Sequence, residues 1–134
     1  MPDPQRRPRG DGGARPAALR LFDAVLTERR PLAESEPALA GLSPAERARA
    51  RRLVIDGFRG MSRADALLAP HLRRRPPPAA LAALRLGVCE LAGGGAAHGV
   101  VNGWVAAVAG AGRKAAAARG MVNAVLRKMA AEAP

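Results

Sequence analysis

The chain has 134 residues, of which 49% are hydrophobic, so its length and composition suit one domain with a single core. No run approaches the roughly 20 apolar residues that span a membrane, and no apolar segment follows the basic N-terminus as in a secretory signal. We therefore expect a cytoplasmic protein with no membrane partner. The formal net charge of +11 indicates a polyanionic partner, although Ala, Gly, Pro and Arg together are also abundant in GC-rich genomes.

Cysteine and histidine give no indication of metal or redox chemistry. Cys89 is the single cysteine, which excludes an intramolecular disulfide, and its helical surroundings favour a small buried side chain over a nucleophile. His71 and His98 do not have the spacing of a metal-binding pair. We predict no catalytic residue, no metal site and no cofactor in this chain.

Residues 1–14 combine Pro, Gly and charge without apolar periodicity, which predicts a disordered tail. Arg6, Arg7 and Arg9 would make it a basic arm for a phosphate backbone, and a merely solvated segment is the alternative. From Arg15 the pattern becomes helical. The core available to the helices is almost free of aromatic residues and rich in Leu, Val, Ala and Met, so an all-α fold is predicted.

The clearest local signal is Ser43-Pro44-Ala45-Glu46, a capping box with proline at the first helical position. It should begin a second helix that is interrupted near Gly60. The first helix must end before Pro31, because proline disfavours a helical residue before it.

Four further helices follow from apolar residues at helical spacing. Ser62 with Asp65 resembles a second cap and should begin the third helix. The run RRRPPP at residues 73–78 should end that helix. The remaining three helices are indicated by Leu81, Leu84, Val88 and Leu91, by Val101, Trp104, Val105 and Val108, and by Val122, Val125, Leu126 and Met129. The sum is a compact bundle of six to seven short helices.

Two of these helices carry an asparagine at the edge of the hydrophobic face, Asn102 in HGVVNGWV and Asn123 in RGMVNAVLRKM. Arg119 and Arg127 stand four residues on either side of Asn123 and share its edge. Such an asparagine either bonds a neighbouring helix or a loop carbonyl and fixes the packing, or faces phosphates. We favour the structural role for the asparagines and phosphate binding for the arginines.

Six sequence blocks in this order resemble the NusB-like domain shared by the antitermination factor NusB and bacterial ribosomal RNA cytosine-C5 methyltransferases. The resemblance covers residues 15–131, and its blocks are ARPAALRLFDAVL, SPAERARARRLVIDGFRG, ADALL, ALAALRLGVCEL, HGVVNGWVAAVA and RGMVNAVLRKM. RGMVNAVLR is close to the methyltransferase form, since free-standing NusB more often has an acidic residue at the position of Arg127. Gly103 departs from the family, which commonly has Glu there. The resemblance implies an all-α bundle of seven helices in two packed halves.

For function, the resemblance implies the RNA-binding N-terminal domain of a ribosomal RNA methyltransferase. Residues 132–134 would begin a linker to a catalytic domain that holds S-adenosylmethionine and the nucleophilic cysteine. The alternative is a free-standing antitermination factor that binds leader RNA and a ribosomal protein. A monomer that binds ribosomal RNA is expected. The candidate RNA-binding residues are Arg6, Arg7, Arg9, Arg15, Arg113, Lys114, Arg119 and Arg127, and the candidate structural residues are Asn102, Asn123, Ser43 and Glu46.

Overall fold

A computed structural model describes residues 13–29, 31, 37 and 39–132 of the chain. The described part contains seven α-helices, one short 3-10 helix and no strand, which confirms the all-α prediction. The helices are α1 (Ala14–Glu28), α2 (Pro44–Arg59), α3 (Met61–Leu68), η3 (Ala69–His71), α4 (Pro78–Ala92), α5 (Ala97–Ala109), α6 (Arg113–Ala117) and α7 (Arg119–Glu132). Arg6, Arg7 and Arg9 lie outside the described residues.

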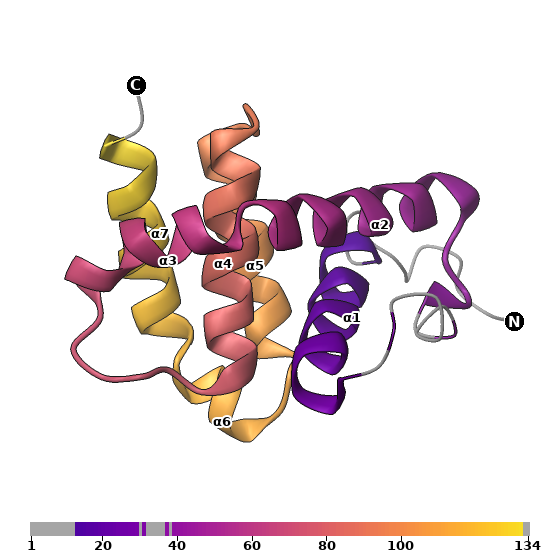
Figure 1. Ribbon diagram of the computed structural model, residues 1–134, viewed down its shortest axis with the longest axis horizontal. Helices are drawn as coiled ribbons and strands as arrows, with labels where there is room; N and C mark the ends of the chain where they lie inside the picture. The colour runs from indigo at the N-terminus through magenta and orange to yellow at the C-terminus, as the bar shows by residue number, and fades with distance from the viewer. Residues whose placement is uncertain (1–12, 30, 32–36, 38, 133–134) are drawn as a thin grey trace, which may run out of the picture.

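Helix α4 lies at the centre of the bundle and packs against α1, α2, α3, α5, α6 and α7. Helices α2 and α3 follow one another across the front of the bundle in Figure 1, while α4, α5 and α7 pack side by side behind them. Helix α1 packs against α2, α4 and α5, and the short α6 lies at the end of the bundle where α7 begins (Figure 1). The other six α-helices therefore surround α4 and bury it at the centre of the core.

The start of α2 has the predicted capping box. The Ser43 hydroxyl accepts a hydrogen bond from the Glu46 amide at 3.1 Å, and the Glu46 carboxylate accepts one from the Ser43 amide at 3.2 Å. Pro44 occupies the first helical position, where no intrahelical donor is lost. The helix ends before Gly60, as predicted from the sequence.

The second predicted cap, Ser62 with Asp65, is wrong. Helix α3 begins at Met61, immediately after Gly60, and has no side-chain cap. Ser62 is therefore already helical, whereas a capping residue needs a non-helical backbone ahead of the first turn. The Asp65 carboxylate instead accepts two hydrogen bonds from the Arg85 guanidinium, at 2.7 and 3.0 Å, and so joins α3 to α4.

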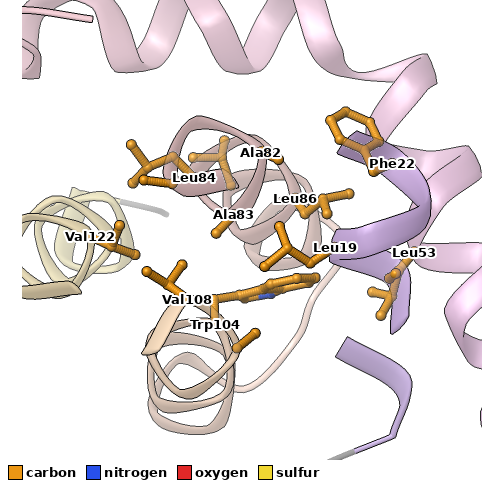
Figure 2. Packing of buried hydrophobic residues seen from close by; sticks show 14 of the residues in the cluster. Leu19, Phe22, Leu53, Ala82, Ala83, Leu84, Leu86, Trp104, Val108 and Val122 are labelled. Carbon is orange, nitrogen blue, oxygen red and sulfur yellow. The ribbon is translucent and has the colours of Figure 1, made fainter. Parts of the chain in front are cut away.

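The core is aliphatic around two aromatic anchors. Trp104 of α5 and Phe22 of α1 are both fully buried, and Figure 2 shows Trp104 between Leu19 and Val108 beside α4. The ring of Phe22 stacks on that of Phe58 with centroids 4.6 Å apart, which fastens α1 to α2. Burial of these apolar surfaces is the main force holding the short helices together.

Gly57 allows α2 to approach both α1 and α4 closely. A methyl group at this position would lie 2.5 Å from Cδ2 of Leu86 and 3.0 Å from Cε1 of Phe22. We expect Gly57→Ala to lower the free energy of unfolding by about 1–2 kcal/mol, because overpacking outweighs the roughly 1 kcal/mol gain in helix propensity. Urea unfolding monitored by circular dichroism measures the change.

Gly120→Ala is the matched control, because Gly120 is also helical but nothing lies within 4 Å of an added methyl group. This variant should be as stable as the original chain or slightly more stable. Equal stability of the two variants would show that the approach at Gly57 is not a constraint.

Candidate nucleic-acid interface

Arg119, Asn123 and Arg127 form a row along one flank of α7, which we call the α7 row. The buried face of this helix is made by Val122, Val125, Leu126 and Met129. Arg119 and Arg127 are exposed, and neither forms an ion pair with any residue that the structure describes. Because they are two turns apart, their Cα atoms are separated by about 12 Å along the helix. Their charges are free to meet an anion from solvent.

Arg113 and Lys114 lie in the first turn of α6 and are both exposed. Helix α6 packs against α7, and Ala118 alone separates the two helices in sequence. Figure 1 shows α6 at the same end of the bundle as the first turn of α7. The fold therefore brings Arg113, Lys114 and Arg119 to one end of the molecule, with Arg127 further along α7.

Arg15 does not belong to this surface. Its side chain is only 9% exposed, and its guanidinium donates two hydrogen bonds to the Glu90 carboxylate, at 3.0 and 2.9 Å. The guanidinium carbon lies 6.0 Å from the centre of the Trp104 ring, within the range of a cation–π contact. We correct the prediction of an RNA contact for Arg15, because a buried, bidentate ion pair already satisfies its charge.

The Glu90 cluster consists of Glu90, Arg15, Arg49 and Trp104. Besides Arg15, the carboxylate accepts a hydrogen bond from the Trp104 indole at 2.8 Å and one from Arg49 at 3.1 Å. Burial alone would raise the pKa of Glu90, but the hydrogen bonds from Arg15 and Trp104 and the charges of Arg15 and Arg49 together lower it. One ionised carboxylate thus connects α1, α2, α4 and α5.

Gly103 lies against this cluster. A methyl group at this position would collide with the Arg15 guanidinium, so the absence of a side chain makes room for the Arg15–Glu90 pair. A larger side chain at Gly103 would therefore have to displace Arg15. The helix α5 remains continuous through Gly103.

Neither asparagine makes the predicted interhelical bond. Asn102 is exposed, and its amide nitrogen lies 3.0 Å from Nε2 of His98 in the same helix. Asn123 is half-buried and has no hydrogen-bond partner among the residues that the structure describes. Each asparagine lies about 100° around its helix from the preceding buried valine, which places it beyond the packed face. Asn123 therefore remains available to a ligand beside Arg119 and Arg127.

A groove of about 540 Å³ lies along the opposite flank of α7, and we call it the basic groove. Its wall is the segment between α3 and α4, and its cationic residues are Arg73, Arg74, Arg75 and Lys128, all four exposed. From the sequence, RRRPPP was interpreted only as the end of a helix, because no local pattern predicts which helix this segment packs against. The three consecutive arginines of this run were the signal that could have indicated a binding surface.

The described residues show neither a cluster of metal-binding side chains nor an activated thiol. They contain no group of three or more His, Cys, Asp or Glu side chains that could hold a metal ion. Cys89 is half-buried, and burial followed by the charges of Asp56 and Asp65 raises the pKa of its thiol, which disfavours the reactive thiolate. None of the helices described is long and apolar enough to cross a membrane.

Comparison with protein-family models matches residues 13–131 to the NusB family. The match covers all seven α-helices apart from the last residue of α7. A comparison with curated proteins finds no match.

Proposed function

Because the chain belongs to the NusB family, we propose that it is the RNA-binding N-terminal domain of a ribosomal RNA cytosine-C5 methyltransferase. Family membership itself indicates RNA binding. The α7 row carries the proposal for this chain, because Arg119 and Arg127 are exposed, unpaired among the described residues and aligned with the free amide of Asn123. Arg113 and Lys114 extend the positive charge onto α6.

The mode of binding is electrostatic. Trp104 and Phe22 are fully buried, and Phe58 is half-buried against Phe22, so the described residues present no aromatic platform on which bases could stack. Arginine contacts to phosphate position the RNA without reading its sequence. The domain would hold the RNA backbone while another domain selects and modifies the cytosine.

The choice of a methyltransferase over an antitermination factor rests on Arg127. The block RGMVNAVLR resembles the methyltransferase form, and an arginine at this position extends the α7 row, whereas an acidic residue would interrupt it. The S-adenosylmethionine site and the nucleophilic cysteine would then belong to a further domain.

Reading the coding sequence past Pro134 tests this choice. A Rossmann-like domain with a Pro-Cys motif supports the methyltransferase. A stop codon instead favours the second candidate, a free-standing antitermination factor that binds leader RNA together with a ribosomal protein.

The salt dependence of RNA binding tests the electrostatic mode. If about five phosphates are engaged, the slope of log K against log salt concentration should be about −3.5 for single-stranded RNA and about −4.5 for a duplex. Fluorescence anisotropy with a labelled ribosomal RNA hairpin, titrated at several potassium chloride concentrations, measures it. A slope near zero would rule out phosphate contacts as the source of affinity.

A further inference from the structure

The basic groove has an aliphatic floor and a cationic rim. Its apolar lining comes from both walls: Leu72, Pro76 and Pro77 on the segment before α4, and Met121, Ala124 and Val125 on α7 with Ala118 just before that helix. The positions on α7 recur at helical spacing, so they form one continuous strip along that helix. Met121 can adapt its shape to another side chain, and the small Ala124 leaves space above it.

The rim has positive charge that no described acidic residue neutralises. Arg73, Arg74, Arg75 and Lys128 are exposed and form no ion pair within the described residues. No acidic side chain lines the groove. At its far end the Glu132 carboxylate lies 3.8 Å from the His71 imidazole, so the chain already places one carboxylate beside this rim.

The lining distinguishes a peptide from a nucleic acid. No aromatic ring other than that of His71, no side-chain amide and no hydroxyl lines the groove, so only its arginines and Lys128 could contact a nucleic acid, and phosphates would leave its aliphatic floor uncovered. An aliphatic strip along a helix, bordered by cations, instead matches the apolar and acidic faces of an amphipathic segment. Its volume of about 540 Å³ is large enough for a few aliphatic side chains.

We propose that the basic groove binds an acidic amphipathic segment of a partner protein. Leu, Ile or Met side chains of that segment pack on Met121, Ala124 and Val125. Its Asp or Glu side chains form charge-assisted hydrogen bonds with Arg73, Arg74 and Arg75. The groove lies on the opposite flank of α7 from the α7 row, so RNA and the acidic segment bind at the same time.

The test uses a short synthetic peptide of alternating Leu and Glu pairs, and a counterpart in which every Glu is Lys. Amide chemical shifts of the isotopically labelled chain should move at Met121, Ala124 and Val125 on addition of the Leu-Glu peptide alone. Ala124→Trp, which fills the groove, should weaken this binding at least about 10-fold, as should combined Arg73→Glu, Arg74→Glu and Arg75→Glu. Arg119→Glu, on the opposite flank, should leave it unchanged.

Lys128→Glu provides a single exposed substitution in case the triple variant folds poorly, and circular dichroism checks the fold of each variant. The proposal is overturned if the Leu-Lys peptide binds as well, if the shifts fall outside the groove, or if these variants bind the Leu-Glu peptide normally. It is also overturned if a ribosomal RNA hairpin displaces the peptide and moves the same groove amides, because the groove would then be an RNA site. If the unsubstituted chain binds the Leu-Glu peptide but does not bind RNA, that result contradicts the proposed function and leaves the peptide proposal standing.

Discussion

Glu90→Gln is expected to lower the free energy of unfolding by about 3 kcal/mol. The substitution keeps the shape of the side chain but removes the negative charge that the Arg15 guanidinium, 9% exposed, meets in this buried ion pair. Removing one partner of a buried ion pair typically costs about 3–5 kcal/mol, and the lower end applies because the Arg49 side of the cluster reaches solvent. Urea unfolding at neutral pH measures the loss.

Two further variants separate the buried pair from the exposed one. Arg49→Ala should cost less than about 1 kcal/mol, because its side chain is 38% exposed and its ion pair is screened by water. Arg15→Met added to Glu90→Gln should cost little more than Glu90→Gln alone, because both substitutions remove the same ion pair. Additive losses from Arg15→Met and Glu90→Gln would show that the two side chains are not coupled.

The same carboxylate should make stability depend on acidic pH. The pKa of Glu90 in the folded chain lies below its ordinary value of 4.5, so folding favours the ionised form. Its contribution is therefore fully present above about pH 4.5 and is lost as the pH falls through the lowered folded-state pKa. Glu90→Gln should show a flatter loss of stability over this range, whereas an unchanged pH profile would assign acid sensitivity to other carboxylates.

The helices were predictable because their causes are local. The capping box at Ser43 and Glu46, and the break at Gly60, act within a few residues of themselves, and the structure confirms both. The apolar spacing of the last helix likewise places Val122, Val125 and Leu126 inside, as observed. Such signals survive in a single sequence because a helix is stabilised by neighbours three and four residues apart.

The polar contacts were not predictable, because they join residues distant in sequence. Glu90 is 75 residues from Arg15 and 41 from Arg49, and no local pattern indicates that these side chains meet. The charge of Arg15 therefore suggested a surface role that its burial contradicts. The basic groove was missed for the same reason, since Arg73, Arg74 and Arg75 acquire their meaning from packing beside α7.

Replacing both Arg119 and Arg127 with Gln should weaken binding of a ribosomal RNA hairpin about 100-fold. Each guanidinium is exposed and unpaired among the described residues, so each can give one charge-assisted hydrogen bond to a phosphate, worth about 1.5 kcal/mol or more. The slope of log K against log salt concentration should also become shallower by about 2. Anisotropy titrations at several salt concentrations give both quantities.

The matched control is Arg52→Gln with Arg59→Gln, which removes the same charge from exposed positions on α2. If the α7 row contacts phosphates, this control should keep its salt slope and lose only the small affinity due to the lower net charge. Equal losses in the two double variants would instead mean that RNA responds to the total charge of the domain. Direct contact therefore requires a change in slope confined to the α7 row, because only a residue that neutralises a phosphate releases its counterion.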